Sequence, residues 1–334
     1  MPVNKAGDQE SKNRNIPLLV LVGPTAVGKT ALAVSVAKKL QTEIISADSA
    51  QVYRFLDIGT AKPSEAEKND APHHLIDLVE PNRDFSVADY QKEAVKVIEK
   101  LWGGGKLPFL VGGTGLYINA VIEGYAFGPK GANREIRDRY EQLASKEGLD
   151  KLYYKLKGID PEAASRIHPN DRRRIIRALE VYELEGRPIS EQVTKTARGE
   201  RGESTYRTLI LGLYMDRGAL YERIEKRVDL MLAAGWLEET RRLFEQGYRD
   251  TDPGMQVLGY RQLLDYLLGR IEWEYMVKEI KKQTRNLAKR QLTWFRRNKD
   301  IEWLKITDQT SIDHLTENIC FKVKDLAPDR ANIY

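Results

Sequence analysis

The sequence predicts an α/β protein, built as a parallel, doubly wound sheet with an all-helical insertion. Three apolar runs, at 16–25, 42–48 and 106–115, each end in turn-forming residues, and helical patterns lie between them. Strands that alternate with helices in this way are typical of a parallel sheet covered on both faces. Between residues 126 and 205 only helical patterns remain, which predicts the insertion.

Each element of the first half has a local signal. The run 16–25 ends in a Gly-Pro turn, and residues 28–40 then show the spacing of an amphipathic helix. In the helical pattern at 85–105, Ser86 is the expected N-cap and three glycines end the helix. Ligands of such sheets bind at the carboxyl ends of the strands, so we look for chemistry there.

The second half is mostly helical before the chain returns to the sheet. Asp160 and Pro161 form an N-cap and first-turn pair. Helices are expected at 133–147, 149–157, 160–167, 170–186, 217–247, 255–269 and 273–298, a polar loop at 187–206, and strands at 206–216 and 301–306. We therefore expect a disordered tail at 1–15, a core of 16–125 with 206–334, and a helical insertion domain at 126–205.

Composition excludes several classes of protein. No run of eighteen apolar residues exists, so no membrane-spanning segment and no membrane partner is expected. The polar N-terminus does not resemble a signal peptide. Cys320 is the only cysteine, which excludes a disulfide framework or a cysteine zinc site, fits the cytoplasm, and suggests a small core residue. The formal charge of +5 favours acidic partners only weakly.

Residues 23–30, "GPTAVGKT", match the phosphate-binding P-loop pattern and are called the phosphate loop below. Its glycines let successive backbone N–H groups point at one anion, and the following helix adds its positive N-terminal end. Lys29 is expected to reach the outer phosphate and the Thr30 hydroxyl to hold a magnesium ion. The loop does not identify the reaction, because a diphosphate binds equally well as part of ATP or as a leaving group.

Asp48 and Ser49 end the second predicted strand and should face the ligand of the phosphate loop. The Asp48 carboxylate could bind magnesium or act as a general base. It could equally cap the next turn through its side chain. Thr114 lies at the same rim, at the end of the third predicted strand.

Three basic segments point to phosphates, although each could be only a solvated helix face. Arg172, Arg173, Arg174 and Arg177 surround an apolar stripe in the helix at 170–186. Arg223 and Arg227 lie four residues apart and could bind an anion or pair with Glu222 and Glu225. The helix at 273–298 carries Lys278, Lys282, Arg285 and Lys289, and nucleic-acid phosphates attract such a stripe regardless of sequence. On the same helix we expect Met276, Ile280, Leu287 and Trp294 to be core anchors.

These stretches together resemble the tRNA dimethylallyltransferases, also called tRNA isopentenyltransferases. The matching motifs are "GPTAVGKT", "DSAQVYRFLDIGTAKP", "HHLID", "FSVADY", "VGGTGLY", "HPNDRRRIIRALEV", "GYRQ" and "AKRQLTWFR", in family order from residue 23 to about 297. The single cysteine leaves no zinc finger of the kind that eukaryotic relatives append, so the chain resembles the bacterial form.

The resemblance implies a P-loop NTPase-like core and transfer of a dimethylallyl group from dimethylallyl diphosphate to the exocyclic amine of adenosine 37 in tRNA. It implies that Asp48 is the base, that Thr25 lies near the reacting centre, and that Lys29 and the cofactor Mg²⁺, bound at Thr30, neutralise charge as the C–O bond breaks. The implied diphosphate site comprises Gly23, Pro24, Thr25, Ala26, Val27, Gly28, Lys29, Thr30, Arg223 and Arg227. Implied contacts to the tRNA anticodon stem-loop are Asp48, Ser49, Ala50, Gln51, Thr114, Arg137, Arg173, Arg174, Ile175, Ile176, Arg177, Gln256, Gly259, Tyr260 and Arg261. To these the basic stripe adds Lys282, Arg285 and Lys289, and we expect a monomer.

Two other functions use the same residues. A small-molecule kinase would share the phosphate loop and would use the arginine helix as a lid. A non-catalytic RNA-binding module would share the basic helices. Consumption of ATP would favour the kinase, whereas RNA binding without turnover would favour the binding module.

Overall fold

The computed structural model describes residues 15–125, 133–191 and 206–327. The chain divides into two compact units, one of 1–123 with 205–334 and one of 124–204. The predicted tail, apart from its last residue, and most of the predicted polar loop at 187–206 lie outside the described residues.

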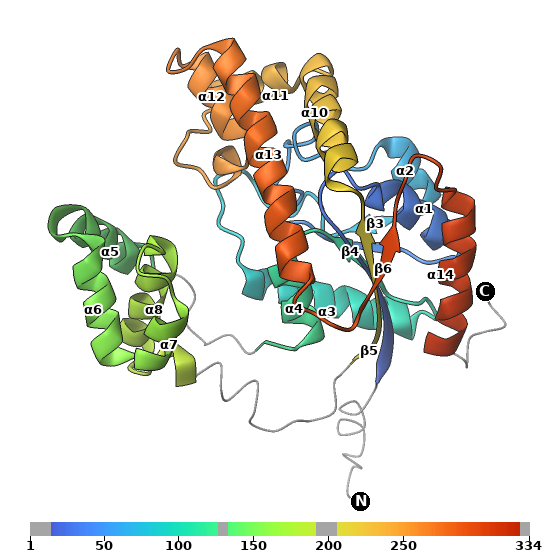
Figure 1. Cartoon of the computed structure of the whole chain (residues 1–334), viewed down its shortest axis with the longest axis horizontal. Coiled ribbons are helices and arrows are strands. Elements are labelled where there is room, and N and C mark those ends of the chain that lie inside the picture. Colours follow the sequence, from blue (N-terminus) through green and yellow to red (C-terminus); the bar gives the residue numbers. More distant parts are fainter. Residues whose placement is uncertain (1–14, 126–132, 192–205, 328–334) are drawn as a thin grey trace, which may run out of the picture. The chain divides into compact units, whose positions relative to one another are not determined.

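The larger unit is built on a six-stranded parallel sheet (Figure 1). In spatial order its strands are β3 (His73–His74), β2 (Ile44–Ala47), β4 (Phe109–Gly112), β1 (Ile16–Val22), β5 (Tyr206–Tyr214) and β6 (Ile301–Lys305). The predicted parallel α/β fold is confirmed, but strand β3 was not predicted from the sequence. Its two residues are too few to show a strand pattern.

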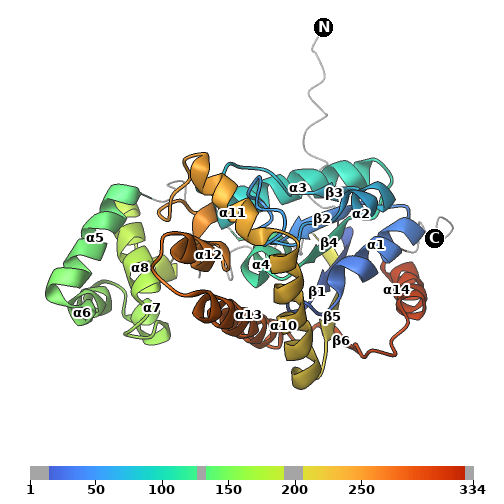
Figure 2. The same ribbon diagram turned by 90° about the horizontal axis from the view of Figure 1, so that it is seen from above.

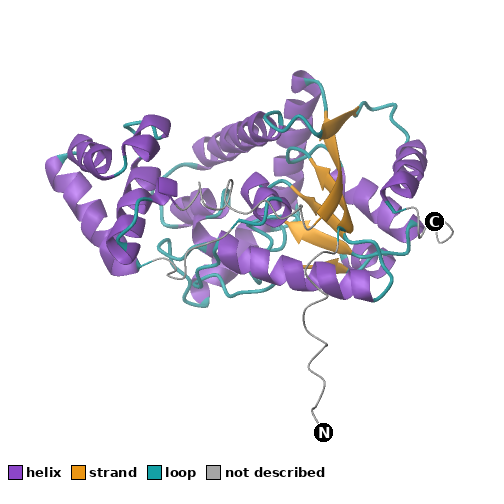
Figure 3. Ribbon diagram, turned by 90° about the horizontal axis from the view of Figure 1, so that it is seen from below, coloured by secondary structure: helices purple, strands orange, loops and turns teal. Residues whose placement is uncertain are grey.

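Helices cover both faces of this sheet, as Figure 3 shows. The helices of the larger unit are α1 (Lys29–Lys39), α2 (Glu65–Asp70), α3 (Val87–Gly103), α4 (Gly115–Ile122), α10 (Arg217–Ala233), α11 (Trp236–Glu245), α12 (Tyr260–Leu267), α13 (Trp273–Phe295) and α14 (Ile312–Leu326), with a 3₁₀ turn at Gly254–Gln256. The helix predicted at 217–247 is broken at Gly235, whose φ of 99° ends α10 and begins α11. Ser86 caps α3 in a reciprocal capping box with Asp89, as predicted.

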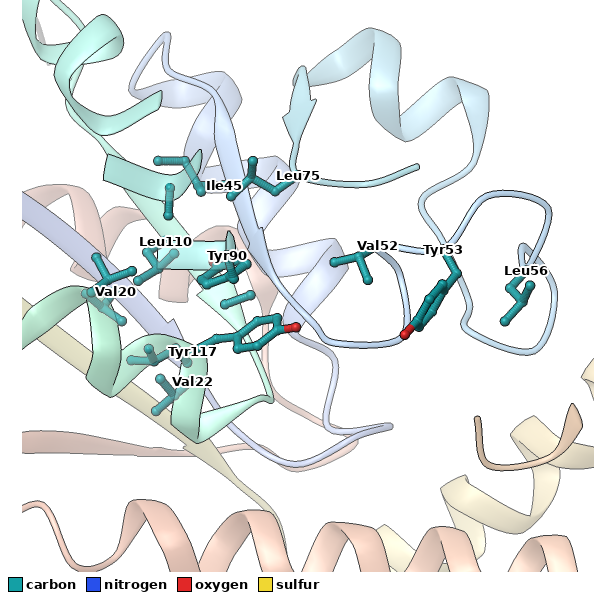
Figure 4. Close-up of a cluster of buried hydrophobic side chains, with 14 of the residues drawn as sticks. Val20, Val22, Ile45, Val52, Tyr53, Leu56, Leu75, Tyr90, Leu110 and Tyr117 are labelled. Atoms are coloured by element: carbon teal, nitrogen blue, oxygen red, sulfur yellow. The ribbon is translucent and has the colours of Figure 1, made fainter. Parts of the chain in front are cut away.

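The alternation of β1 divides the core into two layers. Leu18, Val20 and Val22 pack with residues of α3 and α4, whereas Leu19 and Leu21 pack with α1 and α14. Figure 4 shows part of the first layer, where β-strand side chains meet Tyr90 and Tyr117. Fully burying each such aliphatic side chain stabilises the fold by about 1.5–3 kcal/mol, so both layers hold β1 rigidly beneath the phosphate loop.

The C-terminal helices complete these two layers. Cys320 on α14 is buried in the second layer, which confirms its predicted role as a small core residue. On α13, Met276 and Ile280 are fully buried as predicted, whereas Leu287 and Trp294 are half-buried. No helix in the described parts of the chain is both long and apolar enough to cross a membrane.

The smaller unit consists of helices around its own apolar core. They are α5 (Arg134–Glu147), α6 (Leu149–Ile159), α7 (Pro161–Arg166) and α8 (Arg172–Glu185), each within two residues of its predicted bounds. Asp160 caps α7, since its Oδ1 accepts a hydrogen bond from the Ala163 N–H at 2.9 Å. Its carboxylate also accepts from the N–H and hydroxyl of Ser190, which ties the start of α7 to the segment after α8.

Candidate active site

The phosphate loop connects the end of β1 to the start of α1. Gly23 and Gly28 have φ angles of 154° and 102°, and residues with a side chain rarely adopt this backbone conformation. A Cβ on Gly23 would also lie 2.9 Å from the Leu213 carbonyl oxygen. The two glycines therefore allow the backbone to fold back at the N-terminus of α1, where anions bind.

Lys29 is held inside this loop by its own backbone. Its Nζ donates hydrogen bonds to the carbonyl oxygens of Gly23 (3.0 Å) and Pro24 (2.8 Å). Although the residue as a whole is half-buried, the ammonium group lies among backbone atoms. Burial lowers the pKa of Lys29 to about 8; the nearby Asp48 carboxylate opposes this lowering and Arg227 adds to it.

The ends of three adjacent strands bring Asp48 and Thr114 to the same edge of the sheet. In the register of the sheet Val22 lies opposite Gly112, and Gly112 lies opposite Ala47. The Thr114 hydroxyl accepts a hydrogen bond from the Ser49 N–H at 3.0 Å. The prediction that these residues share one rim is confirmed.

Asp48 caps its own turn with one carboxylate oxygen, since Oδ1 accepts a hydrogen bond from the Ala50 N–H at 2.8 Å. No described residue donates a hydrogen bond to Oδ2. The capping and functional interpretations of Asp48 are thus compatible, because the cap uses one oxygen and orients the other.

Arg227 of α10 completes a group of charges with Lys29 and Asp48. Burial lowers the pKa of Arg227, and the Asp48 carboxylate opposes this lowering. Arg223, one turn earlier, is exposed. Neither arginine forms an ion pair with a described residue, and Glu225 instead binds Arg285 at 2.5 Å. Two cations and one carboxylate at an anion-binding loop suit a diphosphate whose reaction also releases a proton.

Gln291 of α13 belongs to this site, although we did not predict it from the sequence. Its Oε1 accepts a hydrogen bond from the Thr25 N–H at 2.8 Å, and its Nε2 donates to the Gly113 carbonyl at 3.1 Å. One side chain thus joins the phosphate loop to the loop after β4. Trp294, one turn later, packs so closely on Gly115 that a Cβ there would lie 2.2 Å from the indole ring. The sequence does place Gln291 on the same face of the helix as Trp294, a predicted core anchor, and this spacing could have indicated that Gln291 faces the sheet.

The predicted RNA contacts near the sheet differ in their exposure. Ser49, Gln256 and Arg261 are exposed. The Gln51 amide is used within the protein, since its Nε2 donates to the carbonyls of Thr60 and Ala61 at 3.2 Å each. The Tyr260 side chain is fully buried and its hydroxyl binds Glu239, and its contact with RNA stays a prediction. Gly259 is also buried.

In the smaller unit, two predicted RNA contacts surround a buried carboxylate. Arg137 and Arg177 donate hydrogen bonds to Oε2 of Glu180 at 2.9 and 2.8 Å. Burial opposes ionisation of Glu180, yet the hydrogen bonds from Arg177, the Asn133 N–H and Arg137 hold its pKa below the usual range.

The rest of this predicted set divides between surface and core. Arg173 is exposed and forms no ion pair with a described residue, whereas Arg174 pairs with Asp171 at 3.3 Å. The side chains of Ile175 and Ile176 lie in the core of the smaller unit, and the contact of these two residues with RNA stays a prediction.

The basic stripe on α13 is partly neutralised. Lys282 pairs with Glu279 at 3.1 Å, and Arg285 pairs with Glu225. Lys278 and Lys289 are exposed and form no ion pair with the part of the chain that is described. The stripe therefore offers fewer free cations than its sequence indicates.

The oxygen donors at the phosphate loop fit a divalent cation that is bound mainly through the phosphate oxygens of a ligand. Within the described ranges, no three His, Cys, Asp or Glu side chains are grouped to hold a metal ion. Magnesium bound through phosphate oxygens and water needs only one or two protein oxygens. Thr30 on the first turn of α1 and Oδ2 of Asp48 are donors of that kind.

Comparisons with known proteins agree with this geometry. The family model described as IPP transferase matches residues 51–298, and the one described as isopentenyl transferase matches residues 16–78. The tRNA dimethylallyltransferase of Symbiobacterium thermophilum is 50% identical over 315 residues, which cover 94% of this chain and 97% of the relative. That of Natranaerobius thermophilus is 46% identical and covers 97% and 96%.

Solved structures are similar over nearly the whole chain. The full-length tRNA isopentenylpyrophosphate transferase of Bacillus halodurans is 41% identical with a TM-score of 0.68, and the match covers 95% of this chain and 99% of that one. A eukaryotic dimethylallyltransferase acting on tRNA is 29% identical with a TM-score of 0.78, covering 93% and 79%.

Proposed function

The chain belongs to the tRNA dimethylallyltransferase family, and we propose that it transfers a dimethylallyl group from dimethylallyl diphosphate to N6 of adenosine 37 in tRNA. The observation that carries this proposal is the meeting of an anion-binding loop and a carboxylate at adjacent strand ends. Lys29 and Arg227 lie within electrostatic reach of Asp48. We further propose that the chain acts as a monomer.

The phosphate loop binds the diphosphate of the donor in this proposal. Its N–H groups and the ammonium of Lys29 face the phosphate oxygens, and Arg227 supplies a second positive charge. These positive charges stabilise the transition state more than the bound donor, because the leaving group gains negative charge in a partly buried site as the C–O bond to the diphosphate breaks. Magnesium, when bound through Thr30, would add charge neutralisation at the same oxygens.

Asp48 serves the acceptor. The exocyclic amine of adenine is a weak nucleophile, because its lone pair is delocalised into the ring. As its nitrogen bonds to the allylic carbon, one N–H proton passes to Oδ2 of Asp48, and diphosphate leaves with the electrons of the C–O bond. The adenine must leave its stack to reach the pocket.

We assign RNA recognition to six members of the predicted set that are at least partly exposed and form no ion pair with a described residue. They are Ser49, Thr114, Arg173, Gln256, Arg261 and Lys289. Lys289 and Arg173 form no ion pair with a described residue, so their charges are available to backbone phosphates, which contribute affinity without reading sequence.

The direct test incubates the protein with unmodified tRNA, magnesium and dimethylallyl diphosphate, followed by mass spectrometry of the anticodon-loop fragment. We expect the mass of one dimethylallyl group on adenosine 37 and release of diphosphate. An unmodified tRNA, together with ATP-dependent phosphorylation of a small metabolite, would replace the proposal with the kinase function.

Asp48→Asn tests the proposed base. The asparagine keeps the size and the turn but cannot accept a proton, so turnover should fall on the order of a hundredfold or more. Affinity for the donor should change little. The exposed Asp84→Asn is the matched control. If raising magnesium restores turnover of Asp48→Asn, Asp48 positions the metal instead.

A further inference from the structure

Glu239 of α11 makes an unusual set of contacts away from the reacting groups. Its carboxylate accepts hydrogen bonds from the N–H groups of Asp57 (3.1 Å), Ile58 (2.9 Å) and, more weakly, Gly59 (3.4 Å). It also accepts one from the Tyr260 hydroxyl at 2.5 Å. Because one carboxylate accepts from three consecutive N–H groups of a loop that is 180 to 182 residues away in the sequence, this arrangement fixes the loop.

Trp236, one turn earlier on α11, adds a close steric fit. Its side chain is buried, and a Cβ added to Gly59 or to Gly259 would lie 2.0 Å from its ring atoms. Its Nε1 is a buried nitrogen without a hydrogen-bond partner among the described residues. The close packing against Gly59 and Gly259 therefore holds the Trp236 ring in a position where its buried N–H has no acceptor among the described residues.

Tyr260 contacts both Trp236 and Glu239. Its ring meets that of Trp236 edge to face at 5.7 Å. Its hydroxyl accepts a hydrogen bond from the Gly59 N–H at 3.0 Å while donating to Glu239. Burial raises the pKa of Tyr260, and Glu239 raises it further, so the hydroxyl keeps the proton that it donates.

The loop held in this way begins at Asp48. The carboxylate loop, defined here as residues 48–62, is cross-linked by the Gln51 amide, which binds the Thr60 and Ala61 carbonyls. Lys62, at its other end, donates to the Tyr53 carbonyl at 2.8 Å and to the Asp57 carboxylate at 2.7 Å. Holding residues 57–59 thus restrains the segment that starts with the proposed base.

We propose that Glu239, together with Tyr260, is a positioning residue for prenyl transfer: it fixes the carboxylate loop so that Asp48 faces the phosphate loop. This inference rests on the proposed function. It assigns to α11 and α12 a part in the reaction although neither Glu239 nor Tyr260 touches the reacting atoms.

The experiment measures single-turnover transfer to tRNA and donor affinity for Glu239→Gln. An amide in place of the carboxylate presents N–H groups to N–H donors, so the loop should shift. We expect the transfer rate to fall ten- to a hundredfold, while the dissociation constant of dimethylallyl diphosphate stays within about twofold, because the phosphate loop is held by other contacts. Glu238→Gln is the matched control, since that exposed neighbour pairs only with Arg241 in the described chain.

A double-mutant cycle separates positioning from mere stability. If Glu239 acts through Asp48, Glu239→Gln should slow the residual transfer by Asp48→Asn less than twofold. An equal loss in both backgrounds would overturn the proposal, as would a fully active Glu239→Gln. If Glu239→Gln does not fold, Tyr260→Phe removes one hydroxyl and should lose severalfold in rate with the same non-additivity; full activity or an additive loss would overturn it. An inactive wild-type protein would instead remove the proposed function itself.

Discussion

Binding of the prenyl donor should draw a proton from solution when the pH exceeds about 8. Burial lowers the pKa of Lys29 to about 8, with Asp48 opposing and Arg227 reinforcing the change. A diphosphate placed in the phosphate loop adds negative charge beside the ammonium group and raises its pKa again. Above this pH the free protein therefore holds a neutral Lys29, whereas the complex holds a charged one.

The magnitude follows from linkage. At about pH 9, ten of every eleven free molecules carry a neutral Lys29, so the apparent dissociation constant should be about elevenfold larger than at low pH. At about pH 7 the same factor is only about 1.1. The sign is definite: affinity is complete below the pKa of the free protein and is lost as the pH rises through it.

Isothermal titration calorimetry without tRNA measures this effect. Titrations of dimethylallyl diphosphate in two buffers of different ionisation enthalpy should give an uptake of about 0.9 proton at pH 9 and about 0.1 at pH 7. At about pH 9 the donor itself contributes little, because the last ionisation of a phosphate monoester has a pKa of about 6. Lys29→Arg is the control, since arginine stays charged throughout. A wild-type affinity that is constant from pH 7 to 9, with no proton uptake, would refute the reasoning.

Three further results are expected. Gln291→Ala should destabilise the protein by about 1–3 kcal/mol in denaturant unfolding, because it leaves the Thr25 N–H unpaired, while an unchanged midpoint would contradict the bridge. Lys289→Ala should lower the salt dependence of tRNA binding by about one unit of slope and Lys282→Ala by less, because Glu279 already neutralises Lys282; equal slopes for the two variants would be inconsistent with this. Glu180→Gln should cost about 1–3 kcal/mol of folding stability, because the two arginines that lose their partner stay partly exposed to water, and should remove the contribution of Glu180 to the stability lost in acid below the ordinary glutamate pKa; an unchanged unfolding curve at neutral pH would argue against it.

The fold could be predicted because its signals are local. The sequence of β1 is continuously apolar, the glycines of the phosphate loop follow at once, and a helix begins at Lys29. The errors also have local causes. Apolar spacing continues through Gly235, so only the left-handed backbone there ends α10.

The site was predictable only where the sheet topology places it. Asp48 and Thr114 follow strands, and parallel strands bring their carboxyl ends together. Gln291 and Glu239 lie on helices, and their partners are 266 and 181 residues away. Their residue types are ordinary for a helix surface, and nothing in their spacing names the loop that they hold. The burial of Tyr260 was not predictable for a related reason, because it depends on Trp236 and Gly59 rather than on its own helix.

The charges at the phosphate loop separate donor binding from the transfer step. Lys29 must be protonated to bind diphosphate, whereas Asp48 must be ionised to accept the proton of the amine. Once donor is bound, its phosphates keep Lys29 charged, so the rate at saturating donor should not follow the pKa of free Lys29. The ratio kcat/KM for the donor refers to the free protein and should fall above about pH 8. A kcat that fell together with kcat/KM above this pH would mean that Lys29 loses its proton even beside the diphosphate, and that its role extends from binding into the chemical step.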